Sequence, residues 1–132
     1  MRRRAFVRIA TVASAALYVP DFGCHTNEDS FAKVLAQPTV LQRVCDENTI
    51  HRIGEAYLQQ WGNEKEKAEL IRLLTGADHR EVDASTGTAA VASYLNKRVQ
   101  LDFAQDRTII VDGWVLSVTE ARQCALLSLL QK

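Results

Sequence analysis

Apolar residues recur every three or four positions through most of the chain, the spacing that places them on one face of a helix. The clearest stripe consists of Ile50, Ile53, Tyr57 and Trp61. Gly62 ends this segment. A second apolar stripe around residues 70–74 is followed by Gly76, at the position where a residue in the left-handed conformation commonly ends a helix. The pattern predicts that most of the chain is α-helical.

Capping signals divide the remaining helical segments. Asn27 or Ser30 could cap a short helix that Pro38 stops, and a capping-box pattern at residues 39–42 predicts another short helix. Asn63 and Glu66 form a further capping pair before the second stripe. Residues 77–88 are rich in Asp, Ser, Thr and Gly and are expected to form a loop.

A longer helix is predicted from Thr88 to Gln105. Its apolar stripe is Val91, Leu95 and Val99, extended by Phe103. Ala89 and Ala92 leave room on this helix for a close neighbour.

The last third of the chain changes period. Residues 107–111 are short and β-branched, Asp112-Gly113 is typical of a type I′ turn, and residues 114–116 return as a second strand. Ser117-Val-Thr-Glu120 is a capping box that begins a final helix. A lone hairpin is marginal in water, so it should pack on the helices, with Trp114 as its anchor. The fold class expected is therefore mainly α: a small helical bundle with one C-terminal β-hairpin packed on it and a final helix.

Composition bounds the class of protein. The chain has 132 residues, 47% hydrophobic and 24% charged, which excludes a disordered chain and a multi-span membrane protein. Basic and acidic residues both number 16, so bulk charge gives no reason to expect nucleic acid as a partner. The first 23 residues hold four of the bases and one of the acids, which leaves 12 bases and 15 acids, a net charge of −3, in the body.

The basic start is followed by an apolar stretch at residues 9–19, which is too short to span a bilayer and has the length of a signal-peptide core. Arg3 and Arg4, followed by Phe6, Val7 and Arg8, resemble the twin-arginine export signal. Paired guanidinium groups offer fixed donor forks that lysine does not reproduce. An arginine-rich Sec signal and the basic first turn of a soluble helix remain as alternatives.

We therefore expect residues 1–23 to be an export signal and residues 24–132 a single small helical domain, periplasmic or otherwise exported. Gly23-Cys24 resembles part of a lipoprotein box, which makes Cys24 a candidate for lipidation and the N-terminus a candidate membrane anchor. Asp21 and Phe22 fit that box badly. An uncleaved anchor and a different cleavage position stay open.

The inventory of reactive groups is thin. His25, His51 and His79 lie in no recognised ligand spacing, and no phosphate loop, HExxH or G-x-S-x-G motif occurs. Cys45 and Cys124 are expected to be buried thiols, with a disulfide between them as an alternative. We expect no catalytic residue, no cofactor and no metal.

Aromatic residues are few, and they belong by default to the core. Because Trp and Tyr often anchor interfaces, Trp61, Tyr94 and Trp114 are candidate partner-interface anchors.

The twin-arginine-like start, the short helical body and the absence of a cofactor motif together resemble gluconate 2-dehydrogenase subunit 3. Residues 112–122 (DGWVLSVTEAR) are similar to a segment of small twin-arginine signal proteins of unknown activity. The body is shorter than usual for subunit 3, and that family's helical segment has no counterpart in residues 24–60. The resemblance implies a larger catalytic oxidoreductase as partner, flavin-dependent and acting on sugars or sugar acids, and contact with the twin-arginine export machinery.

Two functions follow as expectations. The first is a non-catalytic accessory or export-escort subunit of a periplasmic dehydrogenase. The alternative is a free-standing exported or lipid-anchored helical protein that binds a small ligand or an envelope component.

Overall fold

The computed structural model describes residues 28–62, 66–76 and 81–132. The chain divides into two compact units, residues 1–30 and 31–132. Of the first unit only residues 28–30 are described, and these are helical and exposed. The description below concerns the second unit.

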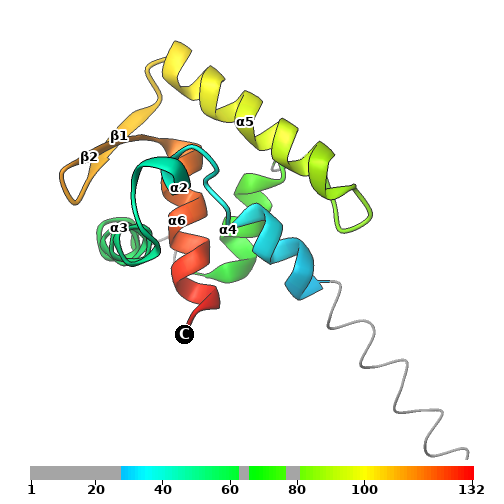
Figure 1. The fold of residues 1–132 in the computed structure, drawn as a ribbon, viewed down its shortest axis with the longest axis horizontal. Helices are drawn as coiled ribbons and strands as arrows, with labels where there is room; N and C mark the ends of the chain where they lie inside the picture. The colour runs from blue at the N-terminus through cyan, green and yellow to red at the C-terminus, as the bar shows by residue number, and fades with distance from the viewer. Residues whose placement is uncertain (1–27, 63–65, 77–80) are drawn as a thin grey trace, which may run out of the picture. The chain divides into compact units, whose positions relative to one another are not determined.

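The second unit is mainly helical, as the sequence predicts (Figure 1). Residues 31–35 are helical. The elements that follow are α2 (Leu41–Val44), α3 (Glu47–Gln60), α4 (Lys67–Leu74), α5 (Thr88–Ala104), β1 (Thr108–Val111), β2 (Trp114–Ser117) and α6 (Val118–Leu130). A helical body with a C-terminal hairpin and a final helix is therefore confirmed.

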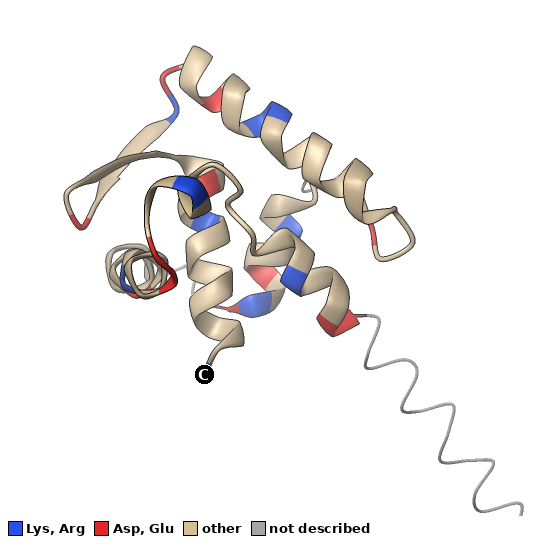
Figure 2. Ribbon diagram, viewed as in Figure 1, with Lys and Arg blue, Asp and Glu red and all other residues tan. Residues whose placement is uncertain are grey.

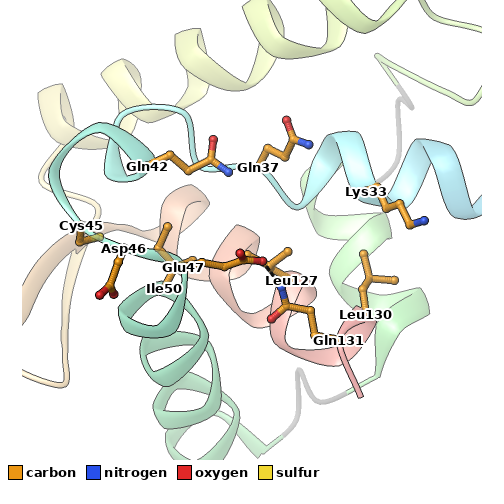
Figure 3. Close-up of a pocket in the computed structure, with 10 residues that line it drawn as sticks. All are labelled: Lys33, Gln37, Gln42, Cys45, Asp46, Glu47, Ile50, Leu127, Leu130 and Gln131. Atoms are coloured by element: carbon orange, nitrogen blue, oxygen red, sulfur yellow. Dashed lines mark hydrogen bonds between the residues drawn. The ribbon is translucent and has the colours of Figure 1, made fainter.

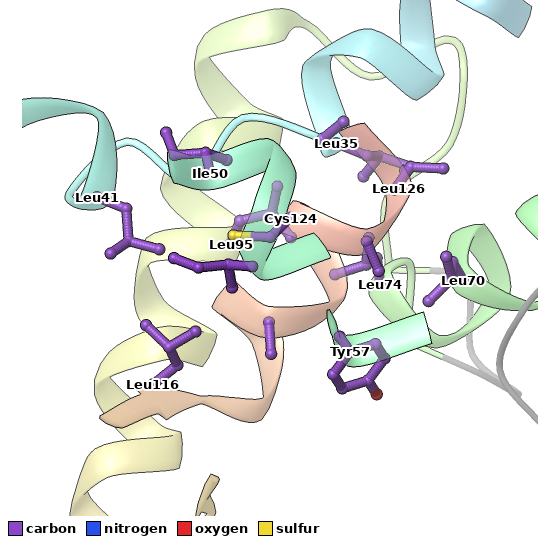
Figure 4. Close-up of a cluster of buried hydrophobic side chains, with 14 of the residues drawn as sticks. Leu35, Leu41, Ile50, Tyr57, Leu70, Leu74, Leu95, Leu116, Cys124 and Leu126 are labelled. Atoms are coloured by element: carbon purple, nitrogen blue, oxygen red, sulfur yellow. The ribbon is translucent and has the colours of Figure 1, made fainter. Parts of the chain in front are cut away.

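Helix α6 is the centre of this unit. It packs against α3, α4, α5 and both strands. Its buried residues cover most of its circumference, as expected for a helix enclosed by others. Figure 4 shows Cys124 and Leu126 of α6 among Leu35, Ile50 and Leu74 from the surrounding segments.

Helices α3 and α6 approach each other very closely at Gly54. A Cβ built on Gly54 would overlap the carbonyl group of Cys124 and lie 2.9 Å from the Cβ of Ser128. Only glycine permits backbones to approach this closely. The stripe predicted for α3 faces this contact: Ile50, Ile53 and Tyr57 are buried.

Two sets of hydrogen bonds stabilise the start of α6. At its start the Ser117 side chain accepts a hydrogen bond from the backbone N–H of Glu120, and the Glu120 carboxylate accepts one from the N–H of Ser117. The predicted capping box is thus confirmed. The buried carboxylate of Asp102 accepts two more hydrogen bonds, from the backbone N–H and the hydroxyl of Thr119, at 2.9 and 2.6 Å. A helix N-terminus favours such anionic acceptors.

Asp102 also corrects the stripe predicted for α5. Val91, Leu95 and Val99 are buried as expected, but Phe103 is 46% exposed and Asp102 is buried in its place. The Thr119 N–H and hydroxyl at the start of α6 require a hydrogen-bond acceptor at this position of α5, so a carboxylate is buried where the spacing of apolar residues predicts an apolar side chain. Ala89 is exposed, so it does not mark a close neighbour.

The capping box predicted at residues 39–42 is wrong. The N-cap of α2 is Val40, which makes no side-chain cap hydrogen bond. The Thr39 hydroxyl instead donates to the side-chain oxygen of Asn96 on α5, at 2.8 Å. A tertiary partner has replaced the local one.

Helix α4 ends as the glycine signal predicts, and α5 supports that end. Gly76 has a φ of +100°. The Arg98 guanidinium of α5 donates to the carbonyl oxygens of Leu73 and Leu74, at 2.8 and 3.1 Å. A cation at a helix C-terminus stabilises the carbonyls that lack intrahelical partners. The N-cap of α4 is Glu66, which makes no side-chain cap hydrogen bond, so the helix begins later than the predicted capping pair of Asn63 and Glu66 places it. Asn63 itself and residues 77–80 of the predicted loop lie outside the described residues.

Candidate functional site

The predicted signal residues, Arg3, Arg4, Phe6, Val7 and Arg8, and the candidate lipidation site Cys24 all lie outside the described residues. His25 and His79 lie outside them as well. The expectations that rest on them stay predictions.

The three predicted interface anchors lie on different elements, and each has its own neighbours. Trp61 follows α3 and stacks on Tyr57, with ring centroids 4.9 Å apart. Tyr94 on α5 has the Arg98 guanidinium 5.7 Å from its ring centroid. All three, Trp114 on β2 included, are half-buried and pack against the core. That they anchor an interface remains a prediction.

The hairpin presents the most exposed apolar pair of the described residues outside α2. Its strands pair Ile109 with Leu116 and Ile110 with Val115. The turn between them is type I′, since Asp112 and Gly113 have φ values of +49° and +80°. Val111 and Leu116 face the core and are 0% and 2% exposed, whereas Ile110 and Val115 are 65% and 61% exposed. We call this cross-strand pair the hairpin outer face.

The hairpin outer face carries no charge. Figure 2 shows both strands free of charged residues, with Asp106 and Arg107 just before β1 and Asp112 at the turn. There the Asp112 carboxylate lies 4.0 Å from the Arg52 guanidinium of α3. Neighbouring β-branched residues on an uncharged face are unusual for water-exposed strands, which normally alternate apolar-in and polar-out. The sequence already indicated an exposed apolar pair. Successive residues of a strand point to opposite faces, so two apolar neighbours in each strand place one side chain outward.

A second candidate site is a groove at the other end of α6, which we call the polar groove. It has a volume of about 500 Å³, within the range of ligand pockets, and is half-open to solvent. Figure 3 shows its lining. The apolar members are Ile50, Leu127 and Leu130, and the polar ones are Lys33, Gln37, Gln42, Cys45, Asp46, Glu47 and Gln131.

The carboxylates of the polar groove lie at the start of α3. Asp46 caps α3 by accepting a hydrogen bond from the backbone N–H of Thr49 at 2.8 Å. Hydrogen bonds from Thr49 hold the pKa of Asp46 below its ordinary value of 3.8, so this side chain is ionised at neutral pH. Glu47 accepts a hydrogen bond from the side-chain amide of Gln131 at 2.5 Å, which joins α3 to the end of α6.

Neither described cysteine has the environment of a reactive thiol. Cys124 is fully buried and Cys45 half-buried, and both are free, so the disulfide between them is not formed. Burial raises the pKa of both thiols. The Cys45 thiol donates to the carbonyl oxygen of Leu41 at 3.2 Å. A raised pKa keeps a thiol protonated and weakly nucleophilic.

His51 is half-buried and has a carboxylate neighbour on its own helix. Its Nδ1 lies 3.9 Å from the Glu55 carboxylate. In the part of the chain that the structure describes, no cluster of three His, Cys, Asp or Glu residues could hold a metal ion. None of the helices formed by these residues is long and apolar enough to cross a bilayer.

No protein-family model, curated protein or solved structure matches this chain. The resemblance to subunit 3 of gluconate 2-dehydrogenase therefore rests on the motifs quoted above.

Proposed function

We propose that this protein is a non-catalytic accessory subunit that carries an export signal and binds a larger periplasmic oxidoreductase. The observation that carries the proposal is the hairpin outer face, an uncharged apolar pair on a hairpin whose other side is buried in the core. Contiguous exposed apolar surface often marks a protein–protein contact, and this cross-strand pair would supply the start of such a surface.

The N-terminal motif supports an export role. The twin-arginine route moves proteins that are already folded, which suits a large enzyme that loads its cofactor first. A small partner with the signal of Arg3 and Arg4 would bind the folded enzyme, direct its export and remain as a subunit. The resemblance to subunit 3 makes a flavin-dependent sugar or sugar-acid dehydrogenase the partner class.

The hairpin outer face would be the centre of that interface rather than the whole of it. Burying one aliphatic side chain completely contributes about 1.5–3 kcal/mol, and Ile110 and Val115 are already partly buried. A stable interface covers about 800 Å² on each partner, far more than two side chains. Neighbouring surface must therefore take part.

Co-purification tests the proposal. A tagged flavin dehydrogenase encoded in a neighbouring reading frame should capture the full chain, and Val115→Glu should abolish capture because it places a charge in the contact. Val44→Glu is the matched control, since Val44 is 66% exposed on α2 and lies outside the hairpin. Absence of a complex, or equal loss with both variants, would contradict the proposal.

Export is tested separately. Replacing Arg3 and Arg4 with lysine should abolish export of the complex while the body stays folded, as judged by circular dichroism. Unchanged periplasmic yield would exclude the twin-arginine interpretation and leave the Sec alternative.

A free-standing exported ligand-binding protein is the second candidate function. The polar groove favours it, because its size fits a small ligand and its lining combines an apolar floor with several polar groups. In that case the chain would act without an enzyme partner.

A further inference from the structure

We infer that the polar groove binds a short aliphatic peptide with free termini, extended between Asp46 and Lys33. This inference does not depend on the proposed enzyme partner, because the groove and the hairpin outer face share no residue.

The charges of the groove are separated. In Figure 3, Lys33 lies at one end, on the helical residues 31–35, and Asp46 lies toward the other, at the start of α3. The Glu47 carboxylate points away from Asp46, toward Gln131, whose side-chain amide donates a hydrogen bond to it. Lys33 is the one cation among the lining residues. A ligand with an ammonium group at one end and a carboxylate at the other matches this distribution in a single orientation.

The space between the charged ends is suited to a peptide chain. Gln37 and Gln42 lie along one side of the groove in Figure 3. A primary amide both donates and accepts hydrogen bonds, and so does each peptide group. The aliphatic side chains of such a peptide would contact Leu127 and Leu130, whereas Ile50 beside them is only 1% exposed.

The leucines of the floor are available because α6 ends here. Leu127 and Leu130 are only half-buried, whereas Leu126 on the same helix is fully buried. Gln123 fixes the segment that contains Leu35 and Gln37, since its side-chain amide donates to the backbone carbonyl oxygens of both residues, each at 3.0 Å. The groove is thus framed by two fixed segments rather than by loosely packed side chains.

Calorimetric titration of the full chain with the tripeptide Ala-Leu-Ala tests the inference. The free peptide should bind in the millimolar range or tighter. N-acetylation or C-amidation should each weaken binding about two- to fivefold, the size expected for loss of one exposed ion pair. Equal affinity for free and blocked peptides, or no heat with the free peptide, would overturn the inference.

Two variants assign the ends. Asp46→Asn keeps a good N-cap residue and should remove the preference for a free amine, and Lys33→Gln should remove the preference for a free carboxylate. Lys97→Gln and Asp106→Asn, exposed residues outside the groove, should change neither preference. Preferences that survive both groove variants would overturn the orientation and with it the inference.

Methyl NMR spectra locate the peptide. Its addition should shift the signals of Leu127 and Leu130 and leave that of Leu116, at the hairpin, unchanged. Shifts confined to the hairpin would place the peptide on the other surface and exclude the groove.

Discussion

The α3–α6 crossing and the hairpin differ in how completely they are enclosed. At the crossing, Gly54 lets two backbones touch, and the residues around it are buried on both helices. In the hairpin, only one face is buried, and the other leaves Ile110 and Val115 more than half exposed. The same kinds of apolar residue are therefore buried in the fold in one place and exposed to solvent in the other.

The difference shows which apolar residues contribute little to the stability of the fold. A side chain already in water in the isolated chain contributes little to its stability, so its replacement should be felt only in binding. A side chain or glycine in the close-packed interior has no room to change. Substitutions can separate the two cases.

Gly54→Ala should have the largest effect. The added methyl group overlaps the Cys124 carbonyl, which is backbone and cannot rotate away. Overpacking costs typically 1–3 kcal/mol and more where the backbone must move, so we expect a loss of about 3 kcal/mol or more in unfolding free energy, measured by urea denaturation. Gly87→Ala is the control, because its Cβ would meet no atom within 4 Å. Similar stability of the two variants would show that the crossing is looser than described.

Leu116→Ala should cost about 2–5 kcal/mol, since Leu116 is 2% exposed and packs in the core. Val115→Ala, one residue away on the same strand, should change stability by less than about 0.5 kcal/mol. Chemical denaturation of both variants measures the contrast between the two hairpin faces. If Val115→Ala is as costly as Leu116→Ala, the hairpin outer face is covered in the free protein and is not available to a partner.

Asp102→Asn should cost about 1–3 kcal/mol, because it weakens the hydrogen bonds from Thr119 at the buried start of α6. Asp106→Asn, on an exposed residue with a φ of +57° that asparagine tolerates, should be nearly neutral. Thermal unfolding distinguishes the two. A neutral Asp102→Asn would mean that the charge of this carboxylate does not contribute to the cap.

The smallest effect concerns the pH dependence of stability at the start of α3. The pKa of Asp46 is lower in the folded chain than its ordinary value of 3.8. Its contribution is therefore complete above that value and is lost as the pH falls through the lower, folded pKa. Asp46→Asn should make stability less dependent on pH in this acidic range, measured by denaturation at a series of pH values. An unchanged slope would contradict the role of the Thr49 hydrogen bonds.

Local signals predicted the elements well. Spacing of apolar residues identified α3 and α5, and Asp112-Gly113 and Ser117-Glu120 identified the hairpin turn and the cap of α6. These features depend on residues within a few positions of each other, so the sequence contains all the information that they need.

Errors arose where a distant residue competes with the local one. Thr39 bonds to Asn96, 57 positions away, instead of capping α2. Asp102 is buried because α6, far along the chain, presents its N-terminus there. No local pattern contains these partners.

The candidate sites follow the same division. The order of residues alone determined the signal-like start, the helical body, the hairpin and its turn. Only the tertiary structure decided which face of the hairpin is left open and that residues 33–50 meet the end of α6 to form the polar groove. The physical reason is that burial and cavities depend on how faces pack against each other, whereas helices and turns are set by the conformational preferences and hydrogen bonds of near neighbours.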